Sequence, residues 1–387
     1  MTEPSTKLRW NALTDPWLPL MDRHGATVWA SPVEVLCGEK DGIDLDYPRD
    51  DFRIYARLLL SALVQALFPA KTKGELKQRI ETPLTRADVE ARIRPVLGDF
   101  DLFGPTPFLQ ITPPPAAHKK EKGAAPFVFC REDLFQPAVR VDAVSIPVAL
   151  VTIFAEQAYA GGAGSGHSTG PSGMPGAFTL IDPGSVRRAA WANTLTLETA
   201  EGQYAPDEAR AWSNAKRSAR PRAAIGIVGG LFFQPRGIWL IPIGEGRCSF
   251  TGRTSALVRL SPFLKKSELT KKSSKGDDVW QHPCAPLATN EKGIRAVRLN
   301  TERPIWTGLA QLLNPISHPR AKKAHPLEGP APVLRQWKNL GNNMKRLRLL
   351  VLDFDRDKAN VKRRFFEAFP LTSDLLGNTD AVERLRS

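Results

Sequence analysis

The sequence lacks a long apolar run and a recognisable export signal. No stretch of about 18 consecutive apolar residues occurs, and the start, MTEPSTKLRW, contains no basic stretch followed by an apolar core. Both absences argue against a membrane span and against export. We therefore predict a soluble protein of the cytoplasm with no membrane partner.

Cysteine is scarce and its spacing carries no metal signature. The four cysteines, Cys37, Cys130, Cys248 and Cys284, lie far apart and form no C-x-x-C pair. Neither a disulfide framework nor a zinc site can be read from such spacing. The six histidines are also scattered, without the spacing of metal ligands. Buried free thiols in a reducing compartment are the simplest interpretation, and we predict no cofactor.

Catalytic motifs are nearly absent. The chain has no G-x-x-x-x-G-K-[ST] nucleotide loop, and no carboxylate pair can be assigned by spacing. Residues 166–170 read G-H-S-T-G, the nucleophile elbow of serine hydrolases, but Pro171 and Pro175 make the helix that must follow an elbow improbable. A serine hydrolase acting through Ser168 is therefore the least favoured alternative, and we predict that the chain is not an enzyme.

Positive charge is abundant and unevenly distributed. The chain has 54 basic and 40 acidic residues, a net charge of +14, and an isoelectric point near 9.8. Residues 1–100 hold 14 basic and 15 acidic residues, which leaves 40 basic and 25 acidic residues downstream. An excess of this size favours a polyanionic partner, with nucleic acid ahead of an anionic membrane surface.

Hydrophobic periodicity indicates helices and strands in blocks. Helical spacing predicts helices over 50–68 and 146–158, one starting at Thr85 as its cap, one over 304–313 with proline at its first position, and a basic amphipathic one over 356–369. Short apolar runs predict strands over 223–235, 237–243, 255–260 and 346–355. Because the elements do not alternate as βαβ units, we expect an α+β fold: a large globular domain of mixed topology with interspersed helices and short sheets.

Two kinds of segment could contact a partner. Residues 161–176 contain seven glycines, which would let another molecule approach the backbone closely, although a flexible linker has the same composition. Lysines cluster at Lys265, Lys266, Lys271, Lys272 and Lys275. Such a cluster either binds phosphates or is a solvated surface run, and composition does not separate these readings.

Five collinear peptides resemble the CasA family, the large subunit of the type I-E CRISPR surveillance complex, Cascade. They are NALTDPWLPL from Asn11, YPRDD from Tyr47, TPFLQ from Thr106, GGLFFQP from Gly229 and WQHP from Trp280. A single peptide would not identify the family, but the order and approximate spacing of all five match the family from Asn11 to about Phe369.

The resemblance implies a non-catalytic, DNA-surveying subunit. Such a subunit recognises the short motif beside the target (the PAM) in double-stranded DNA, helps open the duplex and recruits the helicase-nuclease, while base pairing by the guide supplies the remaining specificity. The implied partners are guide CRISPR RNA, target DNA, the other Cascade subunits and the helicase-nuclease. The alternative is a general RNA- or duplex-binding structural protein without motif specificity.

The resemblance also implies contact residues. The family's glycine loop matches Gly162, Ala163, Gly164, Ser165 and Gly166, and its lysine finger falls near Lys265 and Lys266, with Ser267 at the strictly aligned position. A strand, turn and helix after Leu349 would place Lys358 where the family has a glutamine wedge. The loop that reaches RNA and neighbouring subunits matches residues 119–141, with these candidate contacts: Lys119, Lys120, Lys122, Phe127, Phe129 and Phe135.

Two departures from the family pattern concern zinc and length. Where some members hold zinc with two C-x-x-C pairs, this chain has Ser145, Val148, Cys248 and Thr251, so the resemblance implies no metal here. The resemblance implies a C-terminal four-helix bundle, and we expect most or all of it to be absent from this chain. Three explanations stay open: the bundle is a separate polypeptide, the variant lacks it, or the chain is truncated. We expect one CasA-like domain over 1–369, with a mobile basic loop at about 112–141 and the glycine loop within 161–176, then a tail or the start of a truncated bundle over 370–387.

Overall fold

A computed structural model covers the whole chain, and its placement is described for most of it. The described residues are 8–111, 132–133, 136–137, 143–158, 169–173, 176–213, 221–261, 264–265, 279–291, 293–299, 303–315, 325, 327–340, 347–357, 360–372 and 382.

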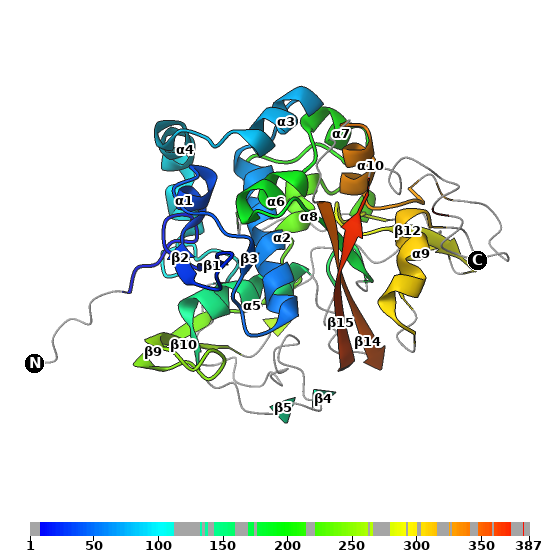
Figure 1. Cartoon of the computed structure of the whole chain (residues 1–387). Coiled ribbons are helices and arrows are strands. Elements are labelled where there is room, and N and C mark those ends of the chain that lie inside the picture. The colour runs from blue at the N-terminus through cyan, green and yellow to red at the C-terminus, as the bar shows by residue number, and fades with distance from the viewer. Residues whose placement is uncertain are drawn as a thin grey trace, which may run out of the picture.

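One buried helix, α2 (Asp50–Leu67), lies at the centre of the molecule (Figure 1). All of its residues except Asp50 and Arg53 are buried, Arg57 included, so burial extends beyond the apolar face that the spacing indicated. The chain leaves the helix at Phe68, and Pro69 follows, which cannot donate a helical hydrogen bond. The prediction of a helix over 50–68 is confirmed.

Buried charges connect α2 to its surroundings. Arg57, only 3% exposed, pairs with Asp44 at 2.9 Å and lies 3.9 Å from Asp182, which is fully buried and also pairs with Arg348. Burial of an ion is costly unless a partner of opposite charge compensates it. Removing Arg57 would leave Asp182 with one fewer compensating charge, so this cluster fixes α2 against the strand that carries Asp182.

The remaining helices are mostly short and several are capped by side chains. Thr85 accepts a hydrogen bond from the Asp88 amide at 3.1 Å, so the predicted cap of the second helix is confirmed. The α-helices besides α2 are α1 (Pro32–Leu36), α3 (Lys73–Glu81), α4 (Arg86–Ile93), α5 (Ile146–Ala158), α6 (Val186–Ala192), α7 (Leu197–Glu201), α8 (Ile227–Leu231), α9 (Leu309–Leu313) and α10 (Pro332–Lys338). The described residues also form the 3-10 helices η1 (Arg94–Phe100), η4 (Arg222–Ala224) and η5 (Ile305–Gly308).

The described strands form small sheets whose paired strands are all antiparallel. The three-stranded orders are β2-β1-β3, β6-β10-β9 and β15-β14-β7, and the pairs are β11-β8, β12-β13 and β4-β5. Their bounds are β1 (Leu18–Met21), β2 (Thr27–Ala30), β3 (Asp44–Leu45), β4 (Glu132–Asp133), β5 (Gln136–Pro137), β6 (Val144–Ser145), β7 (Phe178–Asp182), β8 (Arg236–Gly237), β9 (Leu240–Arg247), β10 (Thr254–Leu260), β11 (Leu264–Lys265), β12 (Leu287–Asn290), β13 (Gly293–Ala296), β14 (Leu347–Asp357) and β15 (Asn360–Leu371). Short antiparallel sheets among helices confirm the predicted α+β class.

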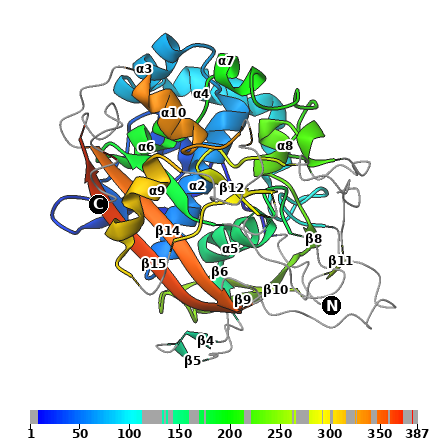
Figure 2. The same cartoon turned by 90° about the vertical axis from the view of Figure 1, so that its right-hand side faces the viewer.

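The long hairpin of β14 and β15 corrects one prediction. The sequence predicted a helix over 356–369, but β15 pairs with β14 from Leu347↔Leu371 to Asp357↔Asn360 (Figure 2). Val361, Phe365 and Phe369 recur every four residues, a spacing that suits one face of a helix and also one face of a strand. Pairing with the preceding strand of the hairpin decides between the two, which periodicity alone does not.

A second correction concerns residues 223–235, which were predicted as a strand and instead contain η4 and α8. Short apolar runs do not distinguish a strand from a buried helix. Here a distant residue favours the helix, because Asp207 accepts hydrogen bonds from the amides of Val228 and Gly229 at 2.9 and 2.8 Å. The helix predicted over 304–313 is present as η5 followed by α9, with Pro304 directly before η5.

The other predictions of local structure agree with the structure. The helix over 146–158 is α5, the strand over 255–260 lies in β10, and the strand over 346–355 lies in β14. The run 237–243 is divided between β8 and β9. Among the described residues, no helix is both long enough and apolar enough to cross a membrane.

Most residues of the five peptides that carry the family resemblance lie in the core, although Thr14, Pro16, Pro48, Asp50 and Thr106 are exposed. Tyr47 donates to the Trp17 carbonyl at 2.5 Å, and Arg49 and Asp51 form a buried ion pair at 2.5 Å. Gly230 of one peptide packs against Trp280 of another. These residues stabilise the fold and do not form an exposed contact surface.

Replacing Gly230 with alanine tests this packing. A Cβ atom there would lie 2.1 Å from Cε2 of Trp280, whose indole is 3% exposed and donates to the Gly226 carbonyl at 3.2 Å. Because overpacking costs about 1–3 kcal/mol, we expect urea denaturation to show a free energy of unfolding lower by that amount. Gly98→Ala is the control, since a Cβ there meets nothing within 4 Å. An equal loss in both variants would contradict the explanation.

Candidate nucleic-acid interface

The predicted contact residues fall almost entirely outside the described part of the chain. This holds for Gly162, Ala163, Gly164, Ser165, Gly166, Lys266 and Lys358, and for the candidate RNA contacts Lys119, Lys120, Lys122, Phe127, Phe129 and Phe135. Ser168 of the hydrolase alternative also lies outside it. Lys265 belongs to β11, although its side chain is not described. The structure does describe the elements from which these segments start.

The glycine loop follows the end of α5, which is held by one buried glutamine. The Gln157 side chain, 1% exposed, accepts from the Arg236 amide at 3.1 Å and donates to the Arg236 carbonyl at 2.8 Å. It therefore satisfies both backbone groups of one residue of β8, as a neighbouring strand would. The end of α5 is fixed to β8 just before the glycine loop begins.

A buried ion pair reinforces the same attachment. Arg236 Nη1 and Glu156 Oε2 lie 2.6 Å apart, and their side chains are 1% and 0% exposed. A buried pair of this kind holds its geometry tightly, because loss of either partner leaves an uncompensated charge in the core and costs about 3–5 kcal/mol. Sequence analysis missed both residues. The available signal was the pair of polar residues, Glu156 and Gln157, at the end of an otherwise apolar helix.

The lysine segment starts on the other side of the same strand. β8 pairs with β11, with Arg236 opposite Lys265 and Gly237 opposite Leu264. Directly paired residues of antiparallel strands have Cα atoms about 4.5–5.5 Å apart. The structure thus brings the end of α5, which precedes the glycine loop in the chain, to the same residue of β8 as Lys265. Figure 2 shows β8 and β11 beside each other.

The far end of the glycine-rich stretch is also anchored. The Ala177 amide donates to the Val297 carbonyl at 2.8 Å, and a Cβ on Gly176 would lie 2.2 Å from that same oxygen. Only glycine fits such a close approach of two backbones. β7 then begins at Phe178, opposite Leu352 of β14.

The proposed wedge position, Lys358, is not brought to β8 by any described contact. β14 runs five residues beyond Leu352 to Asp357, about 17 Å at the usual rise of a strand. Lys358 itself lies outside the described residues, and the segment that follows it, expected to be a helix, is the strand β15. The prediction of a helix after this position is wrong.

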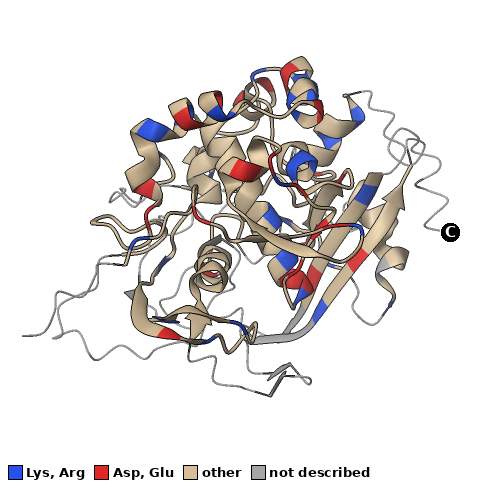
Figure 3. Ribbon diagram, turned by 60° about the vertical axis from the view of Figure 1, so that its left-hand side comes forward, with Lys and Arg blue, Asp and Glu red and all other residues tan. Residues whose placement is uncertain are grey.

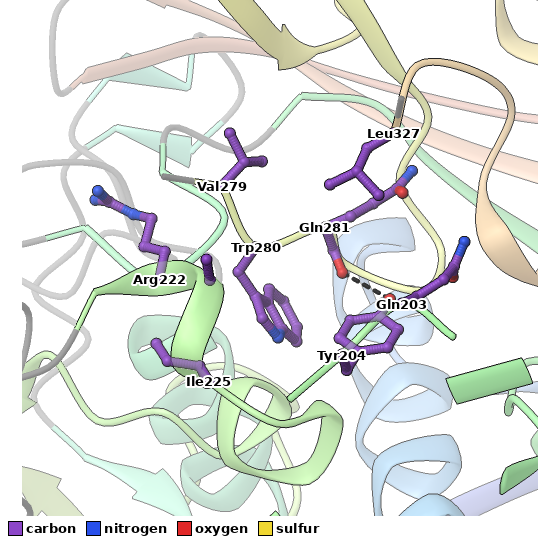
Figure 4. A pocket seen from close by; sticks show the side chains of 9 residues that line it. Gln203, Tyr204, Arg222, Ile225, Val279, Trp280, Gln281 and Leu327 are labelled. Atoms are coloured by element: carbon purple, nitrogen blue, oxygen red, sulfur yellow. Dashed lines mark hydrogen bonds between the residues drawn. The ribbon is translucent and has the colours of Figure 1, made fainter. Parts of the chain in front are cut away.

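A small pocket lies beside α8, with a volume of about 130 Å³ (Figure 4). Burial raises the pKa of Tyr204, whose hydroxyl stays protonated and donates to the Gln281 carbonyl at 2.8 Å. The lining contains no serine, cysteine, histidine or carboxylate that could act as a nucleophile or base. The lining residues are Gln203, Tyr204, Arg222, Ala223, Ile225, Val279, Trp280, Gln281 and Leu327.

Two of the positions aligned with zinc ligands surround one thiol. Cys248 Sγ accepts hydrogen bonds from the amides of Ser145 and Thr251 at 3.3 and 3.5 Å. Burial acts to raise the pKa of Cys248, but hydrogen bonds from Thr251 and from the Ser145 amide outweigh burial and hold it below its usual value. Within the described ranges, no group of three or more His, Cys, Asp or Glu residues is placed to hold a metal ion.

Zinc content provides a direct test. We expect elemental analysis of the purified protein to find far less than one zinc per chain, because one thiolate cannot form a closed tetrahedral structural site. Stoichiometric zinc would show that the alignment around Cys248 is wrong.

The chain is similar to known proteins in sequence and in fold. The sequence model of a family described as CRISPR-associated protein Cse1 matches residues 11–387. CasA (Cse1) of Thermus thermophilus is 20% identical with a TM-score of 0.68, over 97% of this chain and 76% of that chain. Cse1 of Acidimicrobium ferrooxidans is 17% identical with a TM-score of 0.71, over 99% and 74%. A chain from a CRISPR RNA-guided surveillance complex, pre-nicking, is 16% identical with a TM-score of 0.64, over 94% and 74%. At these identities the likeness establishes a shared fold.

Proposed function

Because the chain belongs to the CRISPR-associated Cse1 (CasA) family, we propose that it is a non-catalytic subunit of a type I-E Cascade complex in the cytoplasm. In this proposal it recognises the short motif beside the target in double-stranded DNA, helps open the duplex and recruits the helicase-nuclease. The other partners are the guide RNA and the remaining Cascade subunits.

The observation that supports this proposal is that the end of α5 and strand β11, which lead into the glycine loop and the lysine segment, are both held at β8. Gln157 fixes the end of α5 to Arg236, and Lys265 pairs with Arg236 from the other side. A motif reader needs backbone and cationic groups held at a defined spacing, since base edges are read by placed hydrogen bonds. A flexible linker would need no such anchorage.

Charge supports a polyanionic partner. Figure 3 shows basic and acidic residues intermingled over the described part of the chain. Most of the basic excess lies in the stretches 112–131, 214–220, 316–324 and 341–346, and the last three contain no acidic residue. Lysines and arginines concentrated in this way suit phosphate neutralisation.

The first test measures salt dependence. DNA affinity of the assembled complex should fall by about 0.9 log unit per log unit of salt for each phosphate neutralised. We expect Lys265→Ala with Lys266→Ala to reduce that slope by one or two contacts. The control is Lys71→Ala with Lys77→Ala, two exposed lysines, the second of them on α3, which lies far from β11 in Figure 2. An unchanged slope in the first variant would show that these lysines do not contact phosphates and only form a solvated surface.

The second test changes the glycine loop. Gly164→Asp adds a side chain and a negative charge where backbone should approach DNA, so target binding should collapse while assembly survives. Gly74→Asp is the matched control, because it adds the same charge in the first turn of α3, where a Cβ lies no closer than 3.8 Å to another residue.

Three outcomes separate the alternatives. Ser168→Ala should leave DNA binding nearly intact, whereas a hydrolase would lose activity and its reaction with a fluorophosphonate probe. If Gly164→Asp binds target like the parent, the glycine loop is not a contact. A flat result from a randomised target-flanking library would favour the general RNA- or duplex-binding alternative.

A further inference from the structure

The chain that leads into the predicted basic loop is held beside the same strand. Ile111 is the last described residue before 112–131, and its amide donates at 2.9 Å to the carbonyl of Ile238, the residue that follows β8. Two residues earlier, the Leu109 carbonyl accepts from Gln157 Nε2 at 3.2 Å. One glutamine side chain therefore bonds to Leu109, three residues before the basic loop, and to β8.

Leu109 itself has an unusual backbone. Its φ is +58°, in the left-handed region that a leucine rarely adopts, and its side chain is 1% exposed. Such a conformation costs free energy and persists only where surrounding contacts hold it. The bond from Gln157 to its carbonyl is one of those contacts, so the backbone is fixed at Leu109, shortly before the basic loop.

We infer that Glu156, Gln157 and Arg236 are positioning residues that set the placement of the glycine loop, the lysine segment and the basic loop relative to one another. Together with Leu109 and Lys265 they form what we call the three-way junction. The inference rests on the proposed function, because it assigns the junction a role in motif discrimination.

The junction affects discrimination more than assembly for a physical reason. Phosphate contacts tolerate some displacement, whereas hydrogen bonds to base edges require placement within about 0.5 Å. Loosening the junction therefore weakens the preference for the correct motif while leaving sequence-independent attraction in place.

The main variant combines Glu156→Leu with Arg236→Met. Replacing both members of a buried ion pair by apolar residues of similar volume is often neutral or stabilising, so this variant should fold and join the complex. We measure the ratio of affinities for the preferred and a scrambled flanking sequence. We expect that ratio to fall about tenfold, the discrimination typical of one base pair, with the salt slope unchanged.

A second variant, Gln157→Met, tests the junction without DNA. It removes the hydrogen bonds from the Gln157 side chain to the Leu109 carbonyl and to the amide and carbonyl of Arg236. Hydrogen exchange at the Ile111 and Arg236 amides of the isolated chain should therefore accelerate at least tenfold. Val89→Ala is the control for general loss of stability, because Val89 is fully buried on α4 and contributes nothing to the junction.

The outcomes separate the inference from the function it rests on. If the parent complex shows no motif preference, the proposed function fails, and the role of the junction fails with it. If the parent discriminates and the double variant discriminates equally well, the inference alone is overturned. It is also overturned if Val89→Ala lowers the ratio or accelerates these amides as much as the junction variants do.

Discussion

The buried pair of Glu156 and Arg236 is the constraint on which the arrangement of the candidate interface depends. With both side chains sealed from water, either charge alone would be strongly unfavourable, so the pair holds as a unit. Arg236 is bonded through its backbone to Gln157 on one side and paired with Lys265 on the other. Three stretches of chain are consequently fixed at one point, although 79 positions separate Gln157 from Arg236.

Most residues that make the family recognisable lie in the core, and Leu109 is the one among them that also belongs to the three-way junction. Trp17, Tyr47 and Trp280 are buried, and they pack or hydrogen bond with other core groups. Their role explains why peptides scattered along the sequence match in order: they meet the packing requirements of one shared core. These residues therefore give no information about the contact surface, because a side chain buried in the core does not contact a partner.

Sequence analysis succeeded where the determinants are local. The continuous apolar faces of α2 and α5 and the cap at Thr85 each lie within one element, and all three agree with the structure. It failed at β15 and at α8, where a strand partner and a distant carboxylate decide the outcome. For the candidate site, the sequence indicated the segments and their charge but not their convergence, because that depends on contacts between Gln157, Arg236 and residues far away in the chain.

Affinity and specificity have separate physical origins in this design. The basic stretches supply an attraction that every phosphate backbone shares and that salt weakens. Reading a sequence requires in addition that contact groups keep their spacing when the partner arrives, and thermal displacement of a segment grows with distance from its anchor. When several segments are fixed at one buried point, their thermal displacements are correlated. The segments then move together relative to the DNA and keep their spacing. Discrimination should therefore depend on buried residues that never touch the nucleic acid, while affinity depends on exposed cations that carry no sequence information.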